Sequence, residues 1–109
     1  MSIHKSRIMY IESKAHGLEG LARIGRVTYS KSGRSVTYGG RTFAPMQGFK
    51  ANYYELDSHA AYWISGPKRR GGDRLYGTGR VEIDDDVREE YWTAIREEPH
   101  RIAETFYRD

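Results

Sequence analysis

The sequence predicts a mainly β protein of the α+β type: a small SH3-like barrel, or a curled antiparallel sheet of about six short strands, with a C-terminal helix. Three observations predict this fold. Short runs of β-branched and aromatic residues alternate with Gly- and Ser-rich turns up to residue 83. Residues 84–109 instead space their apolar side chains as a helix does. The chain has 109 residues, so this many strands fit only if the sheet curls and hides its edges. An open antiparallel sheet with a packed helix is the alternative.

The first two strands are expected at residues 7–13 and 22–29, which are rich in β-forming side chains. In the second of these runs, Ile24 and Val27 are out of phase for strict alternation. Gly25 lies between them, so the sequence predicts a bulge or bend at this glycine.

Tight turns connect the next strands. Residues 30–33 end in a glycine that can take a positive φ, and residues 34–38 then return as a strand. Gly39-Gly40 is a two-residue hairpin signal that leads into a short strand at 41–43.

The second half of the body repeats this pattern. Residues 52–56 and 61–65 form another apparent strand pair, joined by a turn at 57–60. After a long polar loop, three short elements are expected: the start of a strand at 75–76, a turn at 77–79 and a last strand at 80–83.

The C-terminal segment is of a different kind. Asp84-Asp85-Asp86 offers N-cap oxygens and negative charge at a helix N-terminus, and Asp86 with Glu89 has capping-box spacing. Pro99 ends the helix. The apolar face of this helix is expected to hold Val87, Tyr91, Ala94 and Ile95, flanked by Trp92.

One more short helical segment is indicated by Ile102, Ala103 and Phe106. We therefore expect a single domain in three parts: a flexible N-terminus at 1–6, a barrel-like body at 7–83 and a helical segment at 84–109 packed on that body.

Charge is unevenly distributed along the chain. Residues 1–81 carry 14 basic and 5 acidic side chains, whereas residues 82–109 carry 4 basic and 10 acidic ones. Arginine, which contacts phosphate through a planar fork and stacks on aromatic rings, supplies 13 of the 18 basic residues. A basic, tyrosine-rich body is compatible with nucleic acid, and a merely soluble surface with an acidic helix attached is the alternative.

Several kinds of chemistry are excluded or unsupported. Cysteine is absent, which removes disulfides, thiol catalysis and cysteine metal sites and favours a cytoplasmic location. We expect no secretory leader, no membrane-spanning helix and no cofactor. The four histidines lack the spacing of a metal-ligand pair on one element, so no metal site is expected.

No catalytic motif is detectable, so we expect a protein that is not an enzyme. Asp57, Ser58 and His59 have the composition of a triad but are adjacent, and adjacent side chains diverge. The scattered carboxylates of Glu12, Glu55 and Glu82 remain candidates for a pair in space.

The most distinctive segment is the loop at 66–74, which carries Lys68, Arg69, Arg70 and Arg74 among its glycines. Glycine lets the backbone approach a ligand closely, and such a loop can grip phosphates. It lacks the Gly-Lys-Ser/Thr ending of a Walker A loop. A solvated hairpin tip, or a contact with an acidic protein, are the other interpretations.

Aromatic residues lie between the basic ones along the body. Most are expected in the core, but an outward ring beside an arginine makes a stacking platform for unpaired bases. Tyr53 and Tyr54 must point to opposite faces of one strand. The candidate nucleic-acid residues besides the loop cations are Arg41, Tyr54 and Trp63.

Sequence segments spread over nearly the whole chain carry a resemblance. They include Arg7-Ile8-Met9-Tyr10-Ile11-Glu12, Ala22-Arg23-Ile24-Gly25-Arg26-Val27, Gly48-Phe49-Lys50-Ala51-Asn52-Tyr53, Tyr62-Trp63-Ile64-Ser65-Gly66 and Val81-Glu82-Ile83-Asp84-Asp85-Asp86. On these the chain resembles a family of small bacterial proteins of unassigned function. The resemblance implies a free-standing bacterial domain and transfers no catalytic or binding residue.

Two main functional hypotheses follow. The favoured one is a non-enzymatic cytoplasmic binding module for nucleic acid, in which the loop cations contact phosphates and exposed rings stack. The alternative is a protein-interaction module, such as an immunity-type or regulatory inhibitor, that docks through the acidic helix with Tyr91 and Trp92.

Overall fold

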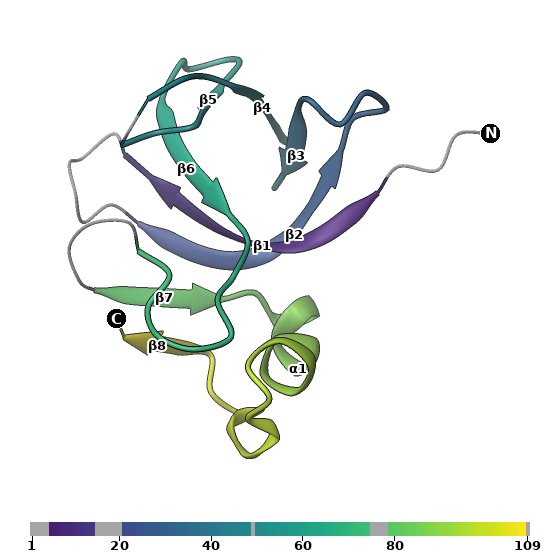
Figure 1. The fold of residues 1–109 in the computed structure, drawn as a ribbon, viewed down its shortest axis with the longest axis vertical. Coiled ribbons are helices and arrows are strands. Elements are labelled where there is room, and N and C mark those ends of the chain that lie inside the picture. The colour runs from purple at the N-terminus through teal and green to yellow at the C-terminus, as the bar shows by residue number, and fades with distance from the viewer. Residues whose placement is uncertain (1–4, 15–20, 49, 75–78, 109) are drawn as a thin grey trace.

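The computed structural model describes residues 5–14, 21–48, 50–74 and 79–108, and its main elements are strands (Figure 1). The strands are β1 (Ser6–Ser13), β2 (Ala22–Tyr29), β3 (Val36–Tyr38), β4 (Arg41–Pro45), β5 (Tyr53–Glu55), β6 (Ala61–Ser65), β7 (Arg80–Ile83) and β8 (Phe106–Arg108). The helical turns are η1 (Asp85–Val87), α1 (Arg88–Glu90), η2 (Tyr91–Ile95) and η3 (Pro99–Arg101). The predicted mainly β fold with a C-terminal helix is confirmed.

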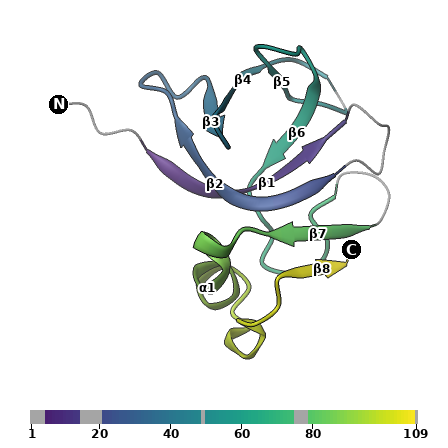
Figure 2. The ribbon, with the colours of Figure 1, turned by 180° about the vertical axis from the view of Figure 1, so that it is seen from behind.

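Six strands form a closed antiparallel barrel in the order β1-β6-β5-β4-β3-β2, and β1 pairs with β2 to complete the circle. Closure is therefore the outcome, and the open-sheet alternative is wrong. Figure 2 shows the barrel from behind, with β7, β8 and the helix gathered on one side of it. Residues 5 and 6, expected to be flexible, take part in the sheet, because Tyr29 donates its backbone N–H to the carbonyl of Lys5 at 2.8 Å.

The predicted glycine turns connect neighbouring strands of the barrel. Gly39 and Gly40 have φ of 60° and 77°, the left-handed pair that a tight hairpin between Tyr38 and Arg41 requires. Gly33 has φ of 78° in the turn before β3. The segments expected at 75–76 and at most of 77–79 lie outside the described residues.

Strands β1 and β2 are buried on both faces and separate two cores. One core fills the barrel and consists of Met9, Ile11, Val27, Val36, Phe43 and Ile64. The other lies outside the barrel, beneath the helix, and consists of Ile8, Tyr10, Ala22, Ile24, Val81, Ile83, Val87, Tyr91, Trp92 and Tyr107. We call these the barrel core and the outer core.

The two cores explain the phase change in β2. Ile24 faces the outer core and Val27 the barrel core, and pairing with β1 passes Gly25 without an inserted residue. The predicted bulge is therefore wrong. Gly25 is required for another reason: a Cβ there would lie 2.5 Å from Oδ2 of Asp84 and against the Tyr38 ring.

The C-terminal part differs from the prediction at its end. Strand β7 pairs in parallel with β2, and β8 pairs with the other edge of β7. Phe106 was expected in a helical segment but lies in β8, where Arg80 covers its ring at 3.6 Å. The free edge of β7 supplies the backbone partners of this strand, and Tyr107 joins the outer core.

The helix runs over residues 85–95 and ends in a wide turn before Pro99, as expected. Val87, Tyr91 and Trp92 are fully buried, whereas Ala94 is exposed, so the buried face is shifted toward Trp92. Asp84 is at the N-cap position but makes no side-chain cap bond, and the predicted capping arrangement is absent from these turns. Its carboxylate instead accepts hydrogen bonds from Arg23 and Tyr38.

Candidate ligand-binding site at the barrel mouth

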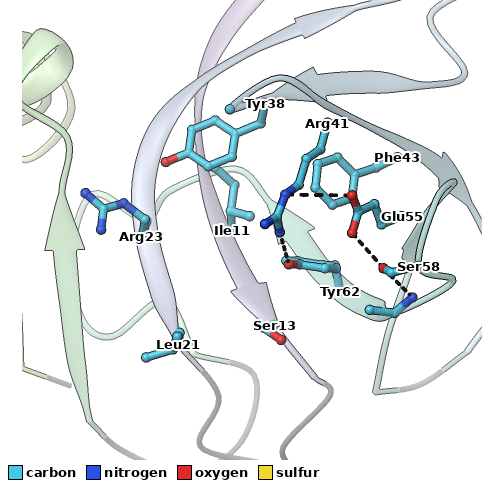
Figure 3. Close-up of a pocket in the computed structure, with 12 residues that line it drawn as sticks. Ile11, Ser13, Leu21, Arg23, Tyr38, Arg41, Phe43, Glu55, Ser58 and Tyr62 are labelled. Carbon is cyan, nitrogen blue, oxygen red and sulfur yellow. Dashed lines mark hydrogen bonds and ion pairs between the residues drawn. The ribbon is translucent and has the colours of Figure 1, made fainter.

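One end of the barrel opens into a pocket of about 570 Å³. The pocket lies where the β3–β4 hairpin and the β5–β6 turn meet the end of β1 and the start of β2 (Figure 3). It is lined by Ile11, Ser13, Leu21, Arg23, Tyr38, Gly39, Arg41, Phe43, Glu55, Ser58, Ala60 and Tyr62. We call it the barrel mouth.

The barrel mouth combines an apolar floor with aromatic and charged groups. Ile11 and Phe43 are almost fully buried and belong to the barrel core beneath it. Tyr38 and Tyr62 come from strands that are separated by two others in the barrel, and both rings are half-buried. The Phe43 ring meets Tyr62 edge-on at 4.8 Å. Such a pocket suits a flat ligand with polar edges.

A carboxylate and an arginine face each other across this pocket. Ser58 donates its hydroxyl to Oε1 of Glu55 at 2.6 Å, while Nε of Arg41 lies 3.7 Å from Oε2. Arg41 also donates from Nη1 to the Tyr62 hydroxyl at 3.3 Å. Figure 3 shows these four side chains directed toward one another. The Arg41–Glu55 separation exceeds that of an N–H···O bond, so neither group satisfies the other.

A second arginine–carboxylate pair at the same mouth is fully engaged. Asp84 accepts from Nε of Arg23 at 2.7 Å and from the Tyr38 hydroxyl at 2.5 Å, and Nη2 of Arg23 lies 2.6 Å from it. Burial raises the pKa of Tyr38 well above the usual tyrosine range, and the hydrogen bond to Asp84 adds to this. Strands β3 and β7 share one edge of β2, and this trio joins them where they part.

The predicted phosphate loop is anchored at one end and exposed at the other. Lys68, Arg69 and Arg70 are exposed, as a projecting loop requires. Arg69, however, forms an ion pair with Glu97. Asp73 is buried and accepts from the backbone N–H of Lys68 at 2.6 Å.

Arg74 lies inside the protein. Its side chain is 4% exposed, and Nη1 is 3.3 Å from the buried carboxylate of Glu12. Lys14 pairs with the same carboxylate at 2.7 Å, and Tyr10 donates its hydroxyl to it at 2.5 Å. The expectation that Arg74 contacts phosphate does not fit this placement, because its charge neutralises an internal group.

The predicted aromatic contacts are also spread apart. Trp63 is half-buried against the outer core, and Tyr54 is half-buried with its ring 6.1 Å from that of His59. Arg41 alone among the predicted site residues lines the barrel mouth in the part of the chain that the structure describes. The structure therefore does not bring the predicted set together on one surface.

The acidic helix does not present Tyr91 and Trp92 as the contact residues that the alternative hypothesis named. Tyr91 and Trp92 are 0% exposed. Acids of this segment pair instead with arginines of the body, in the pairs Arg23–Asp84, Arg26–Glu90 and Arg69–Glu97. The basic body and the acidic C-terminal segment therefore neutralise part of each other's charge within one molecule.

The scattered carboxylates each have a separate environment. Glu12 binds Lys14 and Arg74, Glu55 binds Ser58, and Glu82 pairs with Arg80 at 3.2 Å. No group of three or more potential metal ligands occurs among residues 5–14, 21–48, 50–74 and 79–108. Within these same ranges, no helix has the length and apolar character needed to cross a bilayer.

The sequence reasoning missed most of the barrel mouth, although a signal was present. In an antiparallel meander every second turn lies at the same end. The sequence indicates both the Gly39-Gly40 hairpin and the turn at 57–60, and from this alternation the residues beside them, Tyr38, Glu55 and Ser58, could have been placed at one end of the sheet. Comparison with known proteins adds nothing to this placement, because no family model, curated protein or solved structure matches the chain.

Proposed function

We propose that this chain is a non-enzymatic, cytoplasmic module that binds single-stranded nucleic acid and takes one unpaired base into the barrel mouth. The observation that carries the proposal is the Arg41–Glu55 pair. Its members lie too far apart to hydrogen-bond each other, and they stand beside Tyr62 over the apolar floor of the pocket. Base stacking on a tyrosine ring, with an arginine near the backbone, is the usual means of holding unpaired strands.

The size and composition of the pocket support a base as ligand. A volume of about 570 Å³ lies within the range of small-ligand sites. The half-buried rings of Tyr38 and Tyr62 offer flat contacts, and Ile11 and Phe43 exclude water below them. A duplex cannot enter such a site, so the ligand must be unpaired or have its base turned out.

Phosphate contacts are expected to be few. Arg23 and Arg41 are the two described cations that line the mouth, and Arg41, whose side chain is 57% exposed, lies 3.7 Å from its nearest carboxylate. Arg23 and Arg69 already pair with acids of the C-terminal segment. Each phosphate neutralised on a single strand gives a slope of about −0.7 in log affinity against log salt, so one or two phosphate contacts predict a slope of about −0.7 to −1.4.

The test is fluorescence anisotropy at low salt of labelled decauridine, decathymidine and a decauridine that carries one central guanine. Wild type is compared with Arg41→Ala and with two exposed-arginine controls, Arg34→Ala in the turn before β3 and Arg70→Ala in the 66–74 loop. Loss of a charged contact predicts about tenfold weaker binding for Arg41→Ala and a change within about twofold for both controls. Absence of binding by wild type, or a dominant effect of Arg70→Ala, overturns the proposal.

One observation favours a protein ligand as the second candidate. Leu21, which lines the mouth, is 81% exposed, and Leu56 in the β5–β6 turn is 45% exposed. Large exposed apolar side chains beside a pocket are typical of protein docking sites. A regulatory or immunity-type interaction here predicts a captured protein that is lost on combined Leu21→Ser and Leu56→Ser changes and resists nuclease treatment. Nuclease-sensitive capture supports the nucleic-acid proposal instead.

A further inference from the structure

We infer that the Arg41–Glu55 pair makes the barrel mouth selective for guanine. This rests on the proposed function, because it names the base that the proposed site accepts. Two groups at the mouth have unused hydrogen-bonding positions: the carboxylate of Glu55, which accepts, and the guanidinium of Arg41, which donates. Their order along the wall of the mouth determines which base fits.

Glu55 has acceptor capacity to spare. Glu55 is 7% exposed, so its carboxylate is largely removed from water and needs hydrogen-bond donors from the protein or from a ligand. The Ser58 hydroxyl at 2.6 Å is a short bond to Oε1, whereas Arg41 at 3.7 Å from Oε2 is an electrostatic neighbour only. An ionised carboxylate has about four acceptor positions. A ligand with two adjacent N–H donors would satisfy it.

Arg41 has donor capacity to spare. Its guanidinium has five N–H donors, and the bond to the Tyr62 hydroxyl at 3.3 Å uses one of them. The side chain is 57% exposed, so it can adjust to a ligand without losing a packed environment. If the two N–H donors of a ligand bind Glu55, an acceptor atom of the ligand next to those donors would therefore lie at the Arg41 guanidinium.

Guanine presents this order of groups on one edge. Its amino group N2–H₂, its N1–H and its O6 run donor, donor, acceptor, which is the order that the two oxygens of Glu55 and an N–H of Arg41 complement. The Arg41–Glu55 pair thus imitates the edge of cytosine. Adenine and cytosine each place a ring acceptor beside a single amino donor, and uracil offers one N–H between two carbonyls. Each of these would leave an oxygen of Glu55 opposed or unpaired, which is the basis of discrimination.

The Arg23–Asp84 pair serves as an internal contrast. Arg23 lines the same mouth, but Asp84 already accepts hydrogen bonds from Nε of Arg23 at 2.7 Å and from Tyr38 at 2.5 Å, and Nη2 of Arg23 lies 2.6 Å away. The Asp84 carboxylate is satisfied, and we assign it no part in reading the base.

The experiment compares single-base probes on the wild-type protein. Four decauridines carry G, A, C or U at the central position, and a fifth carries inosine, which lacks the N2 amino group. Because a two-bond contact to a base edge discriminates between bases, the G probe is expected to bind about tenfold more tightly than the A, C and U probes. Inosine is expected between G and A, because it retains N1–H and O6.

Variants locate the selectivity. Glu55→Gln replaces one acceptor by an N–H₂ that faces guanine's own donors, so the G-to-A affinity ratio is expected to fall to within about twofold. Glu82→Gln, on β7 and paired with Arg80, is the matched control and keeps the wild-type ratio. The inosine comparison uses unaltered protein and therefore holds even where Glu55→Gln lowers stability.

The two levels of the proposal fail differently. Equal binding of all five probes by wild type overturns the guanine inference and leaves the module as a binder of unpaired bases. A G preference that survives Glu55→Gln also overturns it, because the selectivity then lies elsewhere. Absence of binding to every probe at low salt overturns the proposed function itself.

Discussion

The barrel mouth and the region around the outer core both contain arginine–carboxylate pairs, but the pairs differ in distance and in exposure to solvent. Around the outer core, the Arg96 side chain is 8% exposed and lies 3.0 Å from the carboxylate of Asp73, which is fully shielded from solvent. At the mouth, Arg41 is 57% exposed and stands 3.7 Å from Glu55. A short, buried pair leaves no capacity for a ligand, whereas a long, accessible pair does. The first kind fastens the fold, and the second is available for recognition.

Asp73 shows how the fastening works. It accepts from the backbone of Lys68, from Arg96 beyond the helix and from the hydroxyl of Tyr107 in β8. One carboxylate thereby joins the 66–74 loop, the end of the helix and the outermost strand. A buried carboxylate surrounded by donors in this way is costly to disturb, because each donor is left unpaired.

The outer core should dominate stability, and Trp92→Ala tests this most strongly. Trp92 is fully buried and also donates its indole N–H to the carbonyl of Glu104 at 2.9 Å. We expect a loss of about 3–5 kcal/mol in the free energy of unfolding, measured by urea titration. Leu56→Ala near the mouth, where the side chain is 45% exposed, should cost no more than about 1 kcal/mol. Similar losses for both variants would erase the contrast between the regions.

Breaking the Asp73 pair should cost nearly as much. Asp73→Ala leaves Arg96 buried without its partner, for which we expect about 3 kcal/mol of destabilisation. The control is Asp85→Ala, since Asp85 has a side chain that is 88% exposed and pairs with Arg88 at the surface. A surface pair of this kind contributes about 0.5 kcal/mol or less. Thermal unfolding of the two variants, run side by side, checks the difference, and equal shifts would contradict it.

The junction between the regions should respond at an intermediate level. A methyl group at Gly25 would collide with Tyr38 and Asp84, so Gly25→Ala should destabilise by about 1–3 kcal/mol. Gly66→Ala is the comparison, because its Cβ would meet only the flexible end of Arg7, at 3.2 Å. If Gly25→Ala unfolds at the wild-type urea concentration, the trio of Arg23, Tyr38 and Asp84 is not rigid.

The smallest effect at neutral pH, and a distinct one in alkali, is expected from the buried tyrosines. Burial raises the pKa of Tyr38, Tyr91 and Tyr107 above the value near 10 that tyrosine has in an unfolded chain. Their protonated forms are favoured by the fold, so this stability is complete below pH about 10 and is lost as the pH rises beyond it. Urea midpoints measured between pH 8 and 11 should therefore fall only above pH about 10. A midpoint that is flat over this range, or falls from pH 8, would contradict the assignment.

The sequence predicted the barrel because its signals are local. The Gly39-Gly40 turn and the β-rich runs at 22–29 and 61–65 each act within a few residues. Strand β8 escaped notice because Phe106, Tyr107 and Arg108 form a strand only against β7, a partner that lies more than 20 residues earlier. The phase change at Gly25 was noticed but misread, since one strand buried by two cores has no solvent face to define its phase.

The candidate site was harder to predict than the fold. Arg41 was identified for its charge, but Glu55 became meaningful only when the pairing of β5 with β4 and β6 showed it beside Arg41. Arg74 shows the opposite error, because its place in a basic loop gave no sign that Glu12, far away in the sequence, would hold it inside. Charge patterns along a chain do not reveal which charges neutralise each other in space.

The most direct test of the mouth as the binding site is an amide-resolved NMR titration of the wild-type protein with the decauridine that carries one central guanine. We expect the largest chemical-shift changes at residues 38–41 and 55–62, around Arg41 and Glu55. Changes confined to residues 66–74, or to the helix at 85–95, would contradict it.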